Sequence, residues 1–235
     1  MIGLIVPPAD GAVPPEGALL YPRLDFEALG LALSEITARG FDAVRGAIVG
    51  RACGLAERGA EAISVMGTSL SFYRGAQGNR ELRDAVHEAT GLPATTMSSA
   101  VVNALRALGV RRVGLATAYI DDLNRRLESF LAEEGFQVAA VEGLGIADVR
   151  SVREVPGSTL AALVERVAAA DRGTQGVLLS CGGLLAQDFI PGLEARLGLP
   201  VVASSPAGFW DVVRLAGRDA AAPGCGRLFE PGLGS

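Results

Sequence analysis

The strongest constraint on the fold is an internal repeat, which relates the first half of the 235-residue chain to the second. The segment IGLIV at residues 2–6 resembles VGLAT at 113–117, and AISVMGTSL at 62–70 resembles GVLLSCGGL at 176–184. A third pair is LPATTMSSAVVNALRALG at 92–109 and LPVVASSPAGFWDVVRLAG at 199–217. Because the pairs agree in order and spacing, the repeat predicts two halves of similar fold.

Short apolar runs alternate with helix-like segments in each half. The runs suit buried parallel strands, and further strands are expected at residues 29–36 and 136–144. Helices are expected at 41–59, 120–135 and 158–173, each ending at a glycine that resembles a C-cap. We therefore predict an α/β protein with two pseudo-symmetric, doubly wound, parallel four-stranded sheets and an active site in the cleft between them.

The boundary between the halves is expected near Gly109. This division gives a first α/β half at residues 1–109 and a second at 110–205. Residues 206–235 are expected to form a C-terminal helix and tail that packs back on the first half.

The charged residues exclude several classes of function. The chain has 26 acidic and 21 basic residues, a net charge of −5, and no lysine. Without a clustered basic face, nucleic acid is not an expected partner. Without lysine, Schiff-base chemistry, lysine-anchored pyridoxal phosphate and the P-loop lysine are excluded. With His87 as the only histidine, a multi-histidine metal site is excluded as well, and we expect neither a metal nor a cofactor.

The beginning of the chain and its cysteines indicate a cytoplasmic protein. The segment MIGLIVPPADG is apolar for only a few residues, so it predicts neither a signal peptide nor a membrane span. Cys53, Cys181 and Cys225 form no CxxC pair, which suits a reducing compartment. Cys53 is expected to be a hydrophobic-core residue on a helix, and Cys225 is expected to have no role in function.

Cys181 has a glycine as its counterpart in the repeat. Aligning the halves without gaps places Cys181 on Gly67, an offset of 114 residues (181 minus 67). Two cysteines at these positions would address opposite faces of one substrate carbon, whereas here only one face has a thiol. Racemisation through a carbanion needs an acid or base on each face, but a carbanion formed by loss of CO2 needs only an acid. The single thiol therefore favours decarboxylation over racemisation. The flanking Ser and Gly-Gly, with the match to GTS in the other half, favour a catalytic over a merely structural cysteine.

Donors for the developing negative charge follow the same strands. A carbanion beside a carboxylate is an enediolate, which needs preorganised hydrogen-bond donors. Thr68, Ser69, Tyr119 and the backbone N–H of Gly182 are the candidates. The serine pair at 204–205 is as readily a helix cap as a ligand contact.

These residues lie in long motifs that resemble the arylmalonate decarboxylase family of the aspartate/glutamate racemase superfamily. The motifs are MGTSLSFYRG at 66–75, the run 96–124, LLSCGGLL at 178–185 and SSPAGFWDVVRLAG at 204–217, and the resemblance covers nearly the whole chain. It implies cofactor-independent decarboxylation of disubstituted aryl- or alkenylmalonates to chiral monocarboxylic acids. In this family the enediolate is held in a dioxyanion hole, here matched by Thr68, Ser69, Tyr119 and Gly182, and Cys181 protonates one face.

The resemblance also implies an apolar pocket for the departing carboxylate. A charge without hydrogen-bond partners is costly there, and its loss as CO2 relieves that cost. The matching positions are Pro7, Leu33, Ile36, Phe41, Val149 and Val152. Phe at 41 and Val at 152 depart from the family pattern of Tyr and Met. These changes bear on substrate size and rate more than on reaction type, or equally are neutral repacking. A monomer acting on a small-molecule malonate is expected, with no membrane partner.

Two alternatives remain open from the sequence. One is a racemase or a cis-trans isomerase of the maleate isomerase kind, from the same superfamily, which normally needs two thiols. The other is a non-catalytic small-molecule binding protein that keeps the cleft without turnover.

Overall fold

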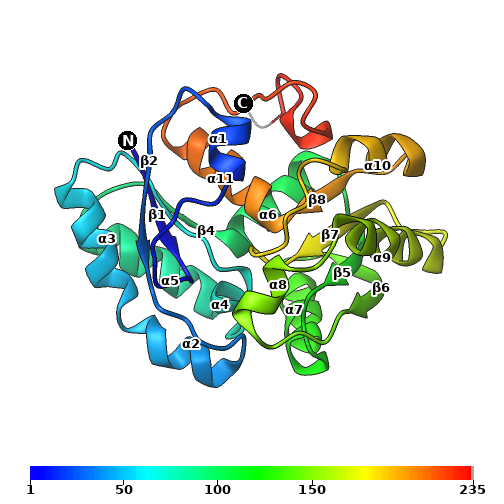
Figure 1. Ribbon diagram of the computed structural model, residues 1–235, viewed down its shortest axis with the longest axis horizontal. Coiled ribbons are helices and arrows are strands. Elements are labelled where there is room, and N and C mark those ends of the chain that lie inside the picture. Colours follow the sequence, from blue (N-terminus) through cyan, green and yellow to red (C-terminus); the bar gives the residue numbers. More distant parts are fainter. Residues whose placement is uncertain (234–235) are drawn as a thin grey trace.

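Two parallel four-stranded sheets form the centre of the protein, seen in a computed structural model that describes residues 1–233 (Figure 1). The first sheet has the order β2-β1-β3-β4 and the second has the order β6-β5-β7-β8, so the two halves share one topology. The strands are β1 (Ile2–Val6), β2 (Phe26–Gly30), β3 (Ile63–Val65), β4 (Ala94–Thr96), β5 (Arg112–Thr117), β6 (Gln137–Gly143), β7 (Gly176–Ser180) and β8 (Val201–Ala203). The predicted fold class is confirmed.

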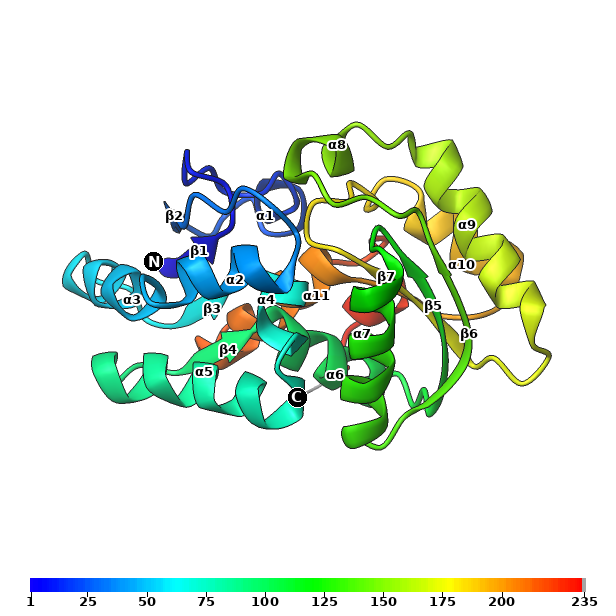
Figure 2. The same cartoon turned by 90° about the horizontal axis from the view of Figure 1, so that it is seen from below.

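Helices cover both faces of each sheet, as Figures 1 and 2 show together. In the first half they are α1 (Glu16–Leu20), α2 (Ala38–Arg45), α3 (Ile48–Glu57), α4 (Thr68–Phe72), α5 (Gly75–Thr90) and α6 (Met97–Ala107). In the second half they are α7 (Asp121–Glu133), α8 (Val149–Arg153), α9 (Gly157–Ala170), α10 (Ile190–Leu197) and α11 (Ser204–Leu215), followed by the 3-10 turn η1 (Arg227–Phe229). No helix among the described residues is long and apolar enough to cross a membrane.

The two halves meet mainly through α6 and α11, which are equivalent helices of the repeat. Trp210 and Phe209 on α11 are fully buried, and the Phe209 ring packs edge-on against Phe26 of the first sheet with 5.0 Å between centroids. The buried Asp211 carboxylate accepts hydrogen bonds from Thr95 Oγ1 at 2.6 Å and Asn103 Nδ2 at 3.0 Å. Apolar packing and a satisfied buried charge therefore fix one half on the other.

The segment after α11 contacts both halves. Tyr21 of the first half donates from its hydroxyl to the Ala220 carbonyl at 2.9 Å. Gln187 of the second half donates to the Cys225 carbonyl at 2.6 Å, and Phe229 is buried. The tail thus packs on the second half as well as on the first. The domain boundary near Gly109 stays a prediction.

Three local expectations were wrong. The strand expected at residues 29–36 lies at Phe26–Gly30, because Ala32 adopts a left-handed φ of 56° that ends the extended run. The helix expected at 41–59 is interrupted between α2 and α3, at Gly46. Gly173 does not cap α9, which ends in an extended Asp171.

A buried polar cluster lies where α1 meets α11. Glu16 is 3% exposed, and neither carboxylate oxygen has a hydrogen-bond partner among the described residues; the same holds for the hydroxyls of Ser204 and Ser205. Ser205 lies close by without forming a well-aligned bond, and neither serine caps α11. Burial raises the pKa of the Glu16 carboxyl, opposed by its own backbone N–H, Ser205 and Arg153.

We expect Glu16→Gln to stabilise the protein at pH 8 by about 1–2 kcal/mol, since it removes a buried, poorly hydrogen-bonded charge. The folded-state pKa of Glu16 lies above its unfolded value, so the wild type loses stability as the pH rises through the folded pKa, and the advantage of the variant shrinks at pH 4. Urea unfolding at both pH values measures this difference. Glu57→Gln, at an exposed position on α3, is the control, and an equal effect of the two substitutions would contradict the account.

Candidate active site

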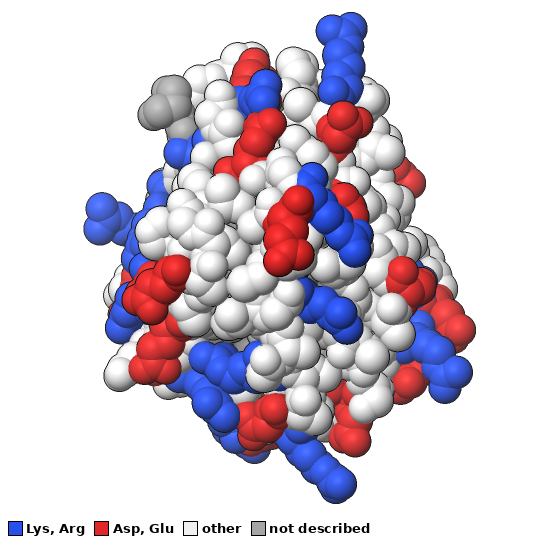
Figure 3. Space-filling view, turned by 90° about the vertical axis from the view of Figure 1, so that its left-hand side faces the viewer, with Lys and Arg blue, Asp and Glu red and all other residues white. Residues whose placement is uncertain are grey.

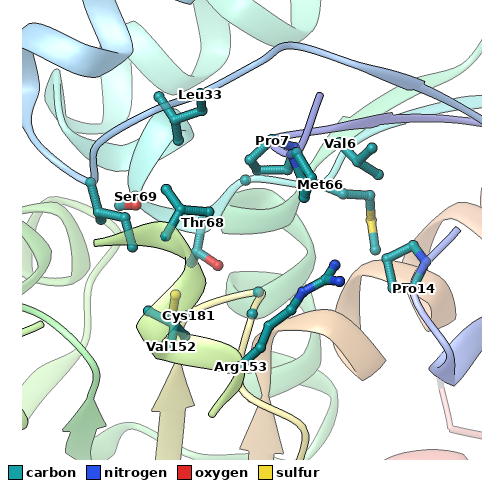
Figure 4. A pocket seen from close by; sticks show the side chains of 16 residues that line it. Val6, Pro7, Pro14, Leu33, Met66, Thr68, Ser69, Val152, Arg153 and Cys181 are labelled. Atoms are coloured by element: carbon teal, nitrogen blue, oxygen red, sulfur yellow. The ribbon is translucent and has the colours of Figure 1, made fainter. Parts of the chain in front are cut away.

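One cavity lies between the carboxyl ends of the two sheets, where ligands of open parallel sheets bind (Figure 4). It encloses about 590 Å³ of space not filled by atoms, part of which is open to solvent. Its lining residues come from both halves: Val6, Pro7, Pro8, Pro14, Leu33, Ile36, Met66, Gly67, Thr68, Ser69, Val149, Val152, Arg153, Cys181, Gly182 and Gly183.

The end of β3 supplies the hydroxyl side of the cavity. The chain passes from Gly67 directly into α4, so that Thr68 and Ser69 line the cavity from the first turn of this helix. Behind them, the Ser71 hydroxyl lies within hydrogen-bond distance of the Gly67 and Thr68 carbonyl oxygens, and Ser98 donates to the Thr68 carbonyl at 2.9 Å. These two serines hold the turn in place and were not singled out from the sequence, although both belong to the quoted motifs.

The end of β7 supplies the thiol. Cys181 is 8% exposed and has a φ of 156°, in a region that non-glycine residues rarely adopt. A Cβ atom on the next residue, Gly182, would lie 2.9 Å from the Met97 sulfur, so the glycine lets this loop pack closely against the start of α6. The first half therefore holds the thiol loop of the second half.

Burial keeps the Cys181 thiol protonated. Desolvation raises its pKa from 9.0 to about 11, while the backbone N–H of Gly183 and the Tyr119 hydroxyl act in the opposite direction. At neutral pH the side chain is therefore a neutral S–H group that can donate a proton, and two nearby donors are in place for the thiolate left behind. The backbone N–H of Gly183 is therefore a second candidate donor, besides the N–H of Gly182 that was expected from the sequence.

Tyr119 lies behind the cavity wall rather than in it. The side chain is 1% exposed, and its hydroxyl oxygen accepts from Ser180 Oγ at 3.2 Å. Burial raises the pKa of Tyr119 well above its usual value, the nearby Cys181 adds to this rise, and Ser180, Thr68 and Ser69 oppose it. The Cys181 thiol and the hydroxyls of Thr68, Ser69 and Tyr119, all candidates from the sequence, therefore lie close together.

The expected apolar residues line the opposite wall, with one exception. Pro7, Leu33, Ile36, Val149 and Val152 all face the cavity.

Phe41 does not face the cavity. It is fully buried against the Tyr73 ring, with 5.1 Å between centroids. Its predicted place in the pocket therefore needs correction, since α2 turns this ring into the core.

Two loops from different halves meet to close the apolar wall. The Ile36 backbone N–H donates to the Ala147 carbonyl at 3.0 Å, and Glu35 forms an isolated antiparallel bridge with Asp148. The wall therefore depends on contact between the halves.

Six lining residues were not predicted: Val6, Pro8, Pro14, Met66, Arg153 and Gly183. Most adjoin residues that were predicted, so extending each motif by one position would have found them. Of the six, only Pro14 adjoins no predicted residue, so no such signal links it to the cavity. Within residues 1–233, no three His, Cys, Asp or Glu side chains cluster as a metal site.

Comparisons with known proteins agree with this geometry. A family model described as arylmalonate decarboxylase matches residues 2–229. An arylmalonate decarboxylase of Bordetella bronchiseptica is 58% identical over 230 residues, or 97% of this chain and 96% of the relative. A maleate isomerase of Nocardia farcinica is 26% identical over 239 residues, or 97% and 95%.

A solved arylmalonate decarboxylase structure, of a variant with a glycine changed to cysteine and a cysteine changed to serine, superposes with a TM-score of 0.96. It is 57% identical, and the match covers 97% of this chain and 98% of that one. The two changed positions are 114 residues apart, as are Gly67 and Cys181.

The raised pKa predicts slow alkylation of Cys181 by iodoacetamide, because the thiolate is the nucleophile. At pH 8 the rate should be about 100-fold below that of an unperturbed thiol and should rise tenfold per pH unit up to about pH 11. Mass spectrometry of the tryptic peptides gives the rates, with Cys53 as internal reference. A rate for Cys181 that already levels off near pH 9.0 would overturn the raised pKa.

Proposed function

Because the chain belongs to the arylmalonate decarboxylase family, we infer that it is a carboxy-lyase, an arylmalonate decarboxylase. Its proposed substrates are disubstituted aryl- or alkenylmalonates, and its products are chiral monocarboxylic acids. The observation that carries the proposal is the protonated Cys181 thiol in a cavity where Gly67 occupies the equivalent position of the other half.

The two carboxylates of the substrate bind at different walls of the cavity, one polar and one apolar. One carboxylate is held by hydrogen bonds from Thr68, Ser69 and the N–H of Gly182, with Tyr119 behind them. The other lies against the apolar wall, including Leu33 and Val152, where a charge lacks hydrogen-bond partners. The carbon–carbon bond to this second carboxylate breaks, CO2 leaves, and the electron pair passes into the remaining carboxylate as an enediolate.

Protonation completes the turnover. Cys181 Sγ–H transfers its proton to the α-carbon on the face it addresses, and the enediolate returns to a carboxylate. The Gly183 N–H and the Tyr119 hydroxyl stabilise the thiolate, which regains a proton from water. A single acid on one face gives one enantiomer in excess.

A maleate isomerase or racemase activity is less well supported. A maleate isomerase is 26% identical in sequence, but a second thiol at position 67 would be needed and the chain has glycine there. We further propose a monomer that acts in the cytoplasm; the three free cysteines fit a reducing compartment.

The first test is CO2 release from 2-methyl-2-phenylmalonate by the purified protein beside Cys181→Ala. We expect turnover by the wild type and a loss of at least about 100-fold in kcat in the variant, because the general acid is removed. Unchanged circular dichroism of the variant serves as the control for folding. Equal CO2 release by both proteins would refute the role of the thiol, and none from either would refute decarboxylation of this substrate.

The second test moves the thiol to the other face. A Cβ atom at Gly67 would lie 3.0 Å from Leu70 Cβ and 3.5 Å from Pro7 Cγ, so a side chain fits after a small shift. Gly67→Cys combined with Cys181→Ser should give the opposite enantiomer of the monoacid at a lower rate, as measured by chiral chromatography. Gly67→Ala alone, the control for crowding, should keep the original enantiomer; the same enantiomer from the double variant would contradict the symmetry argument.

A further inference from the structure

Arg153 is the one charged residue among those that line the cavity. It is the last residue of α8 and is exposed at the opening. A Cβ atom on Gly183 would lie 4.0 Å from Arg153 Cγ, so the arginine stem passes over the loop that carries Cys181. In Figure 4 the side chain extends from there toward Pro14 and Met66.

The guanidinium of Arg153 has no ion pair or hydrogen bond to any described residue. Many arginines of the chain are paired, as in Arg58–Glu27 and Arg166–Glu142, and Figure 3 shows basic and acidic side chains interspersed over one face of the molecule. The positive charge of Arg153 acts on the carboxyl group of Glu16. It lowers the pKa of Glu16, against the stronger effect of burial, which raises it. Five N–H donors are therefore available at the cavity for an acceptor brought by a ligand.

The position of the guanidinium suggests which part of a substrate it meets. The hydroxyl donors Thr68 and Ser69 hold one malonate carboxylate, and the wall around Leu33 takes the other. Arg153 extends away from Leu33, toward Pro14. A guanidinium paired with the departing carboxylate would stabilise the ground state and oppose its loss, so the remaining partner is the large α-substituent.

We propose that Arg153 forms a subsite for an anionic group, a carboxylate on the aryl or alkenyl substituent of the malonate. The inference rests on the proposed decarboxylation and refines its substrate class. A planar carboxylate suits a guanidinium because two parallel N–H···O bonds can form. Arg153 thereby acts as a specificity-determining residue, with no part in bond breaking or protonation.

The experiment compares 2-methyl-2-phenylmalonates that carry a carboxylate or a carboxamide at the meta or para ring position. The two groups have nearly the same size and differ in charge. For the better ring position, we expect the wild type to prefer the carboxylate by about 10-fold in kcat/KM, as for a charge-assisted bidentate pair. Arg153→Gln should reduce this preference to near 1 with turnover of the carboxamide changed less than threefold, and Arg153→Lys should retain part of it.

The matched control is Arg150→Gln, on the same helix but outside the cavity lining and 92% exposed. It should leave the preference intact. If the wild type shows no preference at either ring position, or if Arg153→Gln slows both substrates equally, the subsite is refuted and Arg153 only attracts dianions in general. Failure of the wild type to decarboxylate the carboxamide substrates would instead count against the proposed function.

Discussion

The contact between α6 and α11 is the constraint on which the site depends, since it brings two separately wound sheets into one fixed relation. Glycines at the junction allow the close approach. A Cβ atom on Gly208 of α11 would lie 2.9 Å from the Met66 sulfur, and one on Gly182 would lie equally close to the Met97 sulfur. Each half thus packs against the strand end of the other, which brings the thiol of one half to the hydroxyls of the other.

Exclusion of water then has two effects in the same cavity. It raises the pKa of Cys181, which keeps a proton on the sulfur at neutral pH. It also makes the apolar wall unfavourable for a carboxylate, which favours departure as neutral CO2. In the proposed mechanism, one physical cause therefore prepares both the proton donor and the leaving group, while donors around Tyr119 offset the cost where charge must persist.

The sequence was sufficient for the features that repeat or that follow buried strands. The offset between Gly67 and Cys181, and the hydroxyls after the strand at 63–65, could be predicted because a strand fixes where its next residues point. Features that are set by tertiary contacts could not be predicted from the sequence. The left-handed Ala32 looks like any strand residue, and the family resemblance assigned Phe41 to the pocket although α2 turns its ring into the core. Arg153 depends on a five-residue helix whose placement follows from the pairing of Ile36 with Ala147.

The residues assigned to specificity lie on a different part of the fold from those assigned to the chemistry. The groups assigned to proton transfer and charge stabilisation follow core strands, and Thr68 is further held by the buried Ser71 and Ser98. Val149, Val152 and Arg153 all lie on α8, a short helix on the surface joined to the first half through a loop contact. Substitutions on α8 therefore alter the size and charge of the cavity without replacing any group assigned to proton transfer or charge stabilisation, so that specificity can vary while the chemistry stays fixed.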